Sequence, residues 1–153
     1  MNKNVKLKIE GVKISKLKQN IDNKGAVYHY INSESPTYKS FGEIYFSKIN
    51  SGVVKGWKLH KNTIQNMCVP YGELKIVIFD NRFSSKTFGE IDEIYLNDND
   101  EYALLTIPTD LWYSFQSLSK DFTLLTNLID KKYDSGESET MQIKNDLIPY
   151  LWE

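Results

Sequence analysis

The sequence contains little from which a disulfide or a thiolate metal site could be built. Cys68 is the only cysteine among 153 residues, so an internal disulfide and a cysteine-built metal site are both excluded. A single cysteine fits a reducing compartment. No stretch approaches the roughly 20 apolar residues of a membrane span. Lysines interrupt each short apolar run near the N-terminus, where a signal peptide needs a continuous one. We therefore expect a cytoplasmic protein without a membrane partner.

The chain also lacks an excess of charge of either sign. It has 19 Lys and Arg against 20 Asp and Glu, which gives a net charge of -1. Nucleic-acid-binding proteins usually carry a clear basic excess, so we expect no nucleic-acid partner. The 13% aromatic content excludes intrinsic disorder, because these side chains need a core. The length, with no repeat or linker, predicts a single domain over residues 1–153.

Signature motifs of several large enzyme classes are missing as well. The sequence has no Gly-x-Gly-x-x-Gly dinucleotide fingerprint, no phosphate-binding P-loop and no Gly-x-Ser-x-Gly nucleophile elbow. Any activity must therefore rest on another arrangement of side chains.

Many short segments with the pattern of β-strands are present, as period-2 alternation or as compact apolar runs. Turn signals such as Asp22-Asn23-Lys24-Gly25 separate them. This succession predicts an all-β fold, an antiparallel sandwich or barrel, and a jelly roll fits the number of strands. The C-terminal residues 141–153 are expected to fold back over the barrel as a short extension. The predicted strands lie within residues 5–14, 26–31, 42–49, 73–80, 88–96, 102–107, 112–118 and 122–129.

One spacing carries more information than the others. Five residues separate Gly52 from Lys58, one separates Lys58 from His60, four lead on to Gln65, and six more to Gly72. The intervals resemble the first cupin motif, which runs Gly, five residues, His, any residue, His, four residues, Glu, six residues, Gly. Lys58 stands in the place of the first His, and Gln65 in the place of the Glu.

These departures bear on metal binding. A cupin metal site needs imidazoles and a carboxylate that converge inside the barrel, and here His60 is the one good donor that remains. The second cupin motif resembles residues 108–117, where Tyr113 occupies the position of its His. We therefore expect a cupin barrel that binds no metal.

A second resemblance covers about residues 20–139. Residues 22–25 are similar to the Asp-Glu-Arg-Gly turn of the dTDP-4-dehydrorhamnose 3,5-epimerase family, and residues 55–58 stand where that family has Arg-Gly-Leu-His. Residues 72–82 and 85–89 are similar to two further family segments. The resemblance implies a cupin jelly roll that acts on a 4-keto deoxysugar attached to a nucleotide. It also implies a homodimer, in which the turn at residues 22–25 reaches toward the partner's site.

At key positions the residues differ from the family pattern. Lys58 takes the place of the catalytic His, Asn127 that of the catalytic Tyr, and Gln65 that of a phosphate-binding Lys. Two cationic positions persist, as Lys24 and Lys55.

A neighbouring branch, the sugar-nucleotide 3,4-ketoisomerases, has Arg-Gly-x-His-x-His-Lys followed by a Gln. Residues 55–61 with Gln65 are similar to that pattern, as is the later pair Tyr133-Asp134. Epimerase and ketoisomerase therefore both remain open.

The chemistry that both branches share constrains the candidate residues. Removing a proton beside a keto group needs a base at the C–H bond and a cation or donor at the keto oxygen. His60 is the expected base, since histidine has an unperturbed pKa of about 6.5. Lys58, two residues earlier, projects to the same face of the strand and is suited to stabilise an enolate. Tyr113 and Tyr133 are the candidate acids. Such chemistry needs no cofactor.

The substrate-binding candidates are Lys24, Lys55, Gln65, Asn127, Trp112 and Arg82. Each candidate also has a purely structural interpretation. His60 fits a hydrogen-bonded interior residue, Trp112 a core residue, and Arg82 an ion pair at the end of a strand.

Two functions follow. The first is a nucleotide-linked 4-keto-6-deoxysugar epimerase or isomerase in deoxysugar and cell-surface polysaccharide biosynthesis. The second is a catalytically inactive cupin that binds a sugar nucleotide or serves as a partner subunit in glycan assembly. The Lys at position 58 separates them, because an epimerase of the usual kind has His there.

Overall fold

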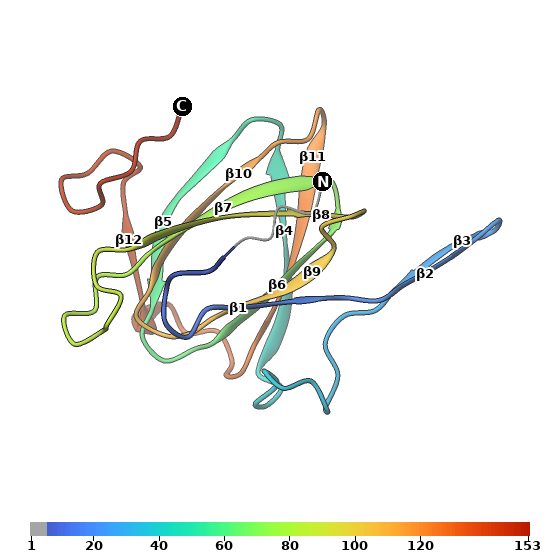
Figure 1. Cartoon of the computed structure of the whole chain (residues 1–153), viewed down its shortest axis with the longest axis horizontal. Helices are drawn as coiled ribbons and strands as arrows, with labels where there is room; N and C mark the ends of the chain where they lie inside the picture. The colour runs from blue at the N-terminus through green and yellow to red at the C-terminus, as the bar shows by residue number, and fades with distance from the viewer. Residues whose placement is uncertain (1–5) are drawn as a thin grey trace.

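The computed structural model describes residues 6–153. Two five-stranded antiparallel sheets face each other, and a two-stranded hairpin extends from them (Figure 1). One sheet has the strand order β1-β9-β6-β11-β4 and the other β12-β5-β10-β7-β8. The predicted jelly-roll barrel is therefore confirmed.

The first sheet contains β1 (Lys13–Lys16), β4 (Glu43–Asn50), β6 (Gln65–Tyr71), β9 (Ala103–Ile107) and β11 (Phe122–Ile129). The second contains β5 (Val54–His60), β7 (Glu73–Phe79), β8 (Ile91–Asn97), β10 (Trp112–Ser117) and β12 (Ser138–Met141), with the 3₁₀ turn η1 (Ser135–Glu137) just before β12.

The strand predicted over residues 5–14 forms only where β1 begins. Val5 lies outside the described residues. Upstream of β1, the Asp92 carboxylate accepts hydrogen bonds from the backbone N–H groups of Lys8 and Ile9, each at 3.0 Å. A side chain thus takes the place of a neighbouring strand as backbone partner.

The main core fills the space between the two sheets. Strands of both sheets contribute fully buried aliphatic side chains, for example Ile76 and Ile78 from β7 and Leu105 from β9. Tyr113 and Phe115 of β10 belong to the same core. Side chains at alternate positions of a strand point to one face, so the intervening residues lie outside the barrel.

A second apolar cluster covers the outer face of the β5-β10-β7 sheet. Trp57, Val77, Phe79 and Trp112 pack there against Ile148 of the C-terminal segment. The predicted return of residues 141–153 over the barrel is confirmed. Trp112, expected at the substrate, lies in this outer layer and is 5% exposed. It faces outward because adjacent residues of a strand point to opposite faces and Tyr113 points inward.

Arg82 also lies away from the barrel interior. Its guanidinium pairs with the Asp80 carboxylate at 2.8 Å, and the hydroxyls of Ser85 and Thr87 each donate to the same carboxylate at 2.7 Å. Burial raises the pKa of Asp80, but these hydrogen bonds outweigh burial and hold the pKa below its usual range. Arg82, a substrate-binding candidate from the sequence, thus forms an ion pair at the end of β7.

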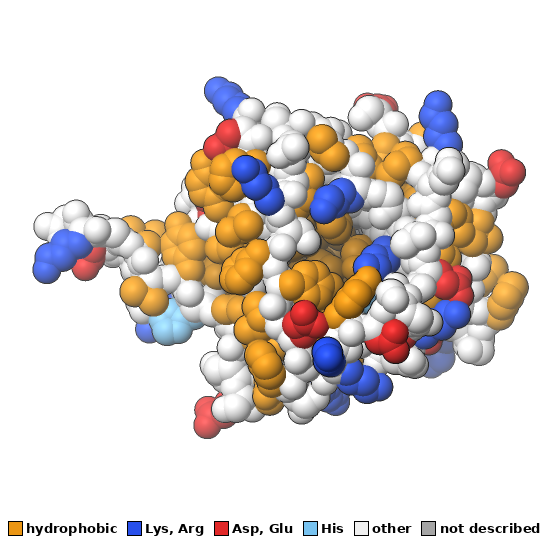
Figure 2. Space-filling view, turned by 180° about the vertical axis from the view of Figure 1, so that it is seen from behind, with side chains coloured by type: hydrophobic (Ala, Val, Ile, Leu, Met, Phe, Trp, Pro, Cys, Tyr) orange, Lys and Arg blue, Asp and Glu red, His pale blue; other side chains and the backbone are white. Residues whose placement is uncertain are grey.

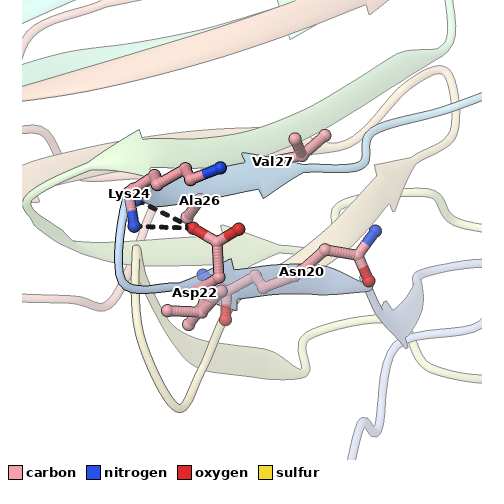
Figure 3. A pocket seen from close by; sticks show the side chains of 8 residues that line it. Asn20, Asp22, Lys24, Ala26 and Val27 are labelled. Carbon is pink, nitrogen blue, oxygen red and sulfur yellow. Dashed lines mark hydrogen bonds between the residues drawn. The ribbon is translucent and has the colours of Figure 1, made fainter.

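The hairpin of β2 (Gln19–Asp22) and β3 (Gly25–Tyr28) stands clear of the barrel (Figure 2). At its tip the Asp22 carboxylate accepts the backbone N–H groups of Lys24 at 2.8 Å and Gly25 at 3.1 Å (Figure 3). Ile21 is 69% exposed and Val27 61% exposed. The hairpin therefore carries apolar side chains that this chain does not cover, and Lys24 lies in the turn at its tip.

Within residues 6–153, no helix has the length and apolarity needed to cross a membrane.

Candidate functional site

A cavity of about 160 Å³ opens between the two sheets. Strands β4, β5, β6, β10 and β11 contribute its wall. Its polar lining consists mainly of two lysines, two phenols and an amide: Lys55, Lys58, Tyr45, Tyr113 and Asn127. Four of these five are candidates from the sequence, so the fold brings together residues up to 72 positions apart (55 to 127).

The alternation of β5 decides which of its residues face this cavity. Trp57 and Leu59 pack into the outer apolar cluster, so Lys58 and His60 point to the inner face. Lys58 is paired in register with Tyr113 of β10, which lies on the same inner face. Lys58 lines the cavity, as expected, whereas His60 lies on the same inner face but is not part of the cavity lining.

His60 is 2% exposed, and both of its ring nitrogens have partners. Nδ1 bonds a Glu137 carboxylate oxygen, and Nε2 lies 3.1 Å from the Tyr113 hydroxyl. Glu137 is itself held by the backbone N–H of Asn62 at 2.9 Å and by the Thr63 hydroxyl at 3.1 Å. The result is a chain of side chains that runs from the carboxylate through the imidazole to the phenol.

Local structure sets the position of Glu137. It ends η1, and the Asp134 side chain caps this turn by accepting the backbone N–H of Gly136 at 2.9 Å. The next residue, Ser138, begins β12 and pairs in register with His60 of β5. Pairing of β12 with β5 therefore brings Glu137 against the imidazole.

Burial and charge set the ionisation of this pair. Burial lowers the pKa of His60, the charge of Lys58 lowers it further, and Glu137 opposes both. Burial raises the pKa of Glu137, but hydrogen bonds from His60, Asn62 and Thr63 outweigh burial and leave it below its usual value. At neutral pH the pair is a neutral imidazole beside a carboxylate.

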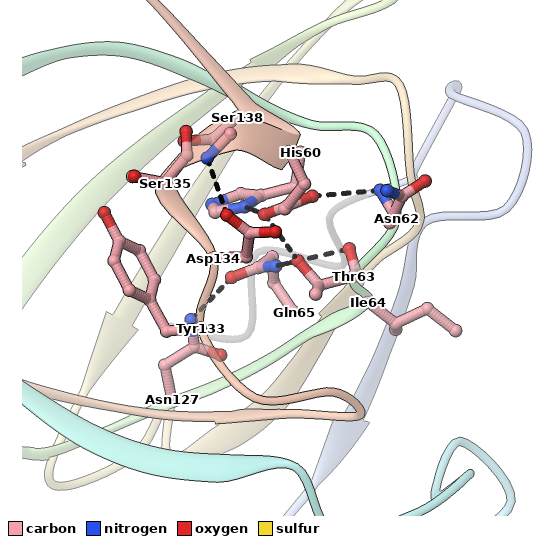
Figure 4. A network of polar contacts seen from close by, with 12 residues as sticks. His60, Asn62, Thr63, Ile64, Gln65, Asn127, Tyr133, Asp134, Ser135 and Ser138 are labelled. Carbon is pink, nitrogen blue, oxygen red and sulfur yellow. Dashed lines mark hydrogen bonds and ion pairs between the residues drawn. The ribbon is translucent and has the colours of Figure 1, made fainter.

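A cluster of amides lies beside the imidazole. Gln65 donates from Nε2 to the Thr63 hydroxyl at 2.9 Å, and its Oε1 accepts from Asn127 Nδ2 at 2.7 Å (Figure 4). Asn127 Nδ2 also donates to the Tyr45 hydroxyl at 2.9 Å. Gln65 and Asn127, taken separately from the sequence, therefore form one hydrogen-bonded unit whose Asn127 end reaches the cavity wall.

Lys58 is the half-buried cation of the cavity. Its Nζ lies 5.4 Å from the ring centroid of Tyr133, a cation–π arrangement at the rim. Burial lowers the pKa of Lys58 and the nearby Lys55 lowers it too, while Glu137 raises it. The two lysines give this small cavity a cationic wall.

Three sequence candidates lie elsewhere. Lys24 is on the hairpin, and Trp112 and Arg82 border a groove on the outside of the sheet. Conversely, Glu137, Thr63 and Tyr45 were not recognised in the sequence. Glu137 is 77 residues from His60, and no motif spacing links the two.

No group of three or more His, Cys, Asp or Glu side chains suited to a metal ion occurs among the described residues.

Comparison with known proteins gives consistent results along almost the whole chain. A model of the dTDP-4-dehydrorhamnose 3,5-epimerase family matches residues 6–153. A probable low-salt glycan biosynthesis epimerase of Haloferax volcanii, Agl13, is 30% identical over 140 residues, which cover 90% of this chain and 89% of that protein. The spore coat polysaccharide biosynthesis protein SpsL of Bacillus subtilis is 27% identical over 146 residues, 94% of this chain and 96% of SpsL.

A solved structure is similar as well. The crystal structure of a dTDP sugar isomerase from Desulfovibrio desulfuricans G20 superimposes with a TM-score of 0.92 at 36% sequence identity. The match covers 94% of this chain and 92% of that one.

Proposed function

This chain belongs to the dTDP-4-dehydrorhamnose 3,5-epimerase family, and from that premise we propose that it is an epimerase or isomerase of a nucleotide-linked 4-keto-6-deoxysugar. Its place is the synthesis of a deoxysugar for a cell-surface polysaccharide, in keeping with the glycan and spore coat roles named for two relatives. A dTDP-linked sugar is the first substrate to try. The protein acts as a single cupin domain over residues 1–153, in the cytoplasm.

The observation that carries the proposal is the His60–Glu137 pair next to a cavity lined by lysines. A neutral imidazole is a competent base, and an adjacent carboxylate stabilises the imidazolium that forms when it takes a proton. The cations Lys58 and Lys55 favour the negative charge that develops on the keto oxygen as the enolate forms. Acid, base and cation suffice for this reaction, so we expect neither a metal nor an organic cofactor.

In this proposal the base is His60, which lies on β5 two residues after the position that resembles the family's catalytic His. Where the resembling family has its catalytic His, this chain has Lys58, and His60 two residues later supplies the imidazole on the same face. Tyr113 and Tyr133 are the phenols available as acids, while Asn127 and Gln65 offer hydrogen bonds to sugar hydroxyls. Lys24 meets nucleotide phosphates only if a second copy of the chain brings it to the cavity.

A homodimer is therefore part of the proposal. The hairpin carries exposed Ile21 and Val27, and β4 exposes Ile44 at 42% and Phe46 at 63%. Burying such surface against a second copy is favourable by roughly 25 cal/mol for each Å² of apolar area. We expect light scattering at micromolar concentration to report twice the 17.8 kDa chain mass. A strict monomer contradicts this part of the proposal.

The alternative is an inactive cupin that binds a sugar nucleotide or serves as a partner subunit. Two points support it: the resemblance that sets Lys58 at the family's base position, and the absence of His60 from the cavity lining. Product formation separates the two functions. The purified protein is incubated with 4-keto-6-deoxysugars linked to dTDP, UDP, GDP and CDP, and the sugar is identified by NMR. Conversion of at least one of them supports the enzyme, whereas calorimetric binding without conversion supports the alternative.

A further inference from the structure

His60 does not reach the cavity by itself. It is 2% exposed and absent from the lining, whereas Tyr113 is part of the lining. Glu137 occupies Nδ1 of the imidazole and the Tyr113 hydroxyl occupies Nε2. A general base must come within about 2.6–3.2 Å of the proton that it removes. In this arrangement the phenol stands between the imidazole and any sugar in the cavity.

The partners also determine the direction of the hydrogen bonds. An ionised carboxylate only accepts, so the Nδ1 proton of His60 points to Glu137, and Nε2 carries the lone pair. The Tyr113 hydroxyl must therefore donate to Nε2 across the 3.1 Å between them. Among the described residues, His60 is the one that this hydroxyl bonds, which leaves the oxygen lone pairs of Tyr113 available to the cavity.

We propose that Tyr113 is the catalytic residue that touches the transferred proton, and that His60 and Glu137 act through it. The proton of the sugar C–H bond moves to the Tyr113 oxygen while the phenol proton moves to Nε2 of His60. The electron pair of the broken C–H bond enters the enolate, and His60 becomes an imidazolium paired with Glu137. The hydroxyl of Tyr113 then exchanges its proton with the solvent. In the reverse transfer this solvent proton goes to the carbon, and the imidazolium of His60 gives its proton back to the Tyr113 oxygen. This inference rests on the proposed function.

The electrostatics of the site favour a relay over a tyrosinate. Burial raises the pKa of Tyr113 well above its ordinary value, and the neighbouring Tyr45 and Glu137 add to the effect. The phenol is therefore protonated before the reaction and again after it. The positive charge appears on the imidazole next to Glu137, and the negative charge appears on the sugar next to Lys58.

Tyr113→Phe tests the relay, because it keeps the ring and removes only the hydroxyl. We expect deuterium incorporation from D₂O into the keto sugar to fall at least about 100-fold, a typical loss for proton transfer by a positioned group. Affinity for the sugar nucleotide should change less than about threefold. Tyr102→Phe is the matched control. It removes another buried phenol hydroxyl, which donates to the His29 carbonyl at 2.8 Å, outside the cavity.

The outcomes separate the relay from the proposed function. If the parent protein exchanges no proton with any keto sugar, both are overturned. If the parent exchanges and Tyr113→Phe stays within threefold of it, only the relay is overturned. A second measurement uses the parent protein alone: the exchange rate is followed in mixtures of H₂O and D₂O. Only the phenol proton of the relay exchanges with solvent beforehand, because the sugar proton is bound to carbon. A relay that moves both protons in one step therefore gives a rate that falls linearly with the deuterium fraction, and a rate that does not depend on the deuterium fraction contradicts it.

Discussion

Replacement of His60 by Asn is expected to lower the rate of proton exchange at the sugar about 10³-fold, within the range for loss of a general base. Asn cannot take a proton, and it leaves the Glu137 carboxylate without the imidazole that it bonds. Exchange is measured by NMR as loss of the sugar C–H signal in D₂O. The only other histidine supplies a matched control, since His29→Asn changes an exposed residue of the hairpin segment.

The pH dependence of the exchange rate also tests the role of His60. Burial lowers the pKa of His60 from 6.5, with a further decrease from Lys58. The neutral imidazole therefore persists below pH 6.5, and the acid limb of the exchange rate should lie on that side. The assignment is reversed if His60→Asn keeps near-normal turnover while Lys58→Arg is inactive.

Replacement of Lys58 by Met should lower the exchange rate about 10²-fold, the scale on which removal of one charge-stabilising donor acts. Met keeps most of the length and apolar stem but removes the cation that faces the developing enolate. Lys58→Arg should retain part of the activity, because the positive charge stays.

Lys61→Met is the matched control for that experiment. Lys61 follows β5 directly, but it pairs with Glu139 at 2.5 Å on the exposed side of the sheet. We expect parental activity from this control. Activity within threefold of the parent for Lys58→Met would contradict the role given to Lys58.

The strands could be predicted because their signals are local. The run at residues 122–129 became β11 with the same bounds, since apolar and β-branched residues there fit a half-buried strand between two neighbours. The same local reasoning failed at the N-terminus. There the carboxylate of Asp92, more than 80 residues away, binds the backbone N–H groups that a strand partner would have taken.

Part of the site could also be predicted from the sequence, because the signals that place it are local. The cupin spacing puts Lys58 and His60 on one strand two residues apart, and period-2 alternation sends them to the same face. That rule, applied to β10, also separates Trp112 from Tyr113. Since neighbours on a strand face opposite ways, only Tyr113 enters the barrel.

The remaining site residues were placed by one contact between distant strands and by one local ion pair. Glu137 comes to His60 only because β12 pairs with β5. For Arg82 the sequence allowed either substrate binding or an ion pair, and the turn after β7 directs its guanidinium back to Asp80. Pairing of two distant strands therefore sets the position of Glu137, and an ion pair with a near neighbour in the sequence sets the orientation of Arg82.

The most direct test of the central claim is the position of deuterium in a sugar recovered from D₂O. The parent protein is incubated with a dTDP-linked 4-keto-6-deoxysugar, and the product is analysed by NMR and mass spectrometry. Abstraction of a proton beside the keto group predicts deuterium at C3, at C5 or at both, and at no other ring carbon. A sugar nucleotide that binds by calorimetry yet returns from D₂O without deuterium, for all four nucleotides, contradicts the account.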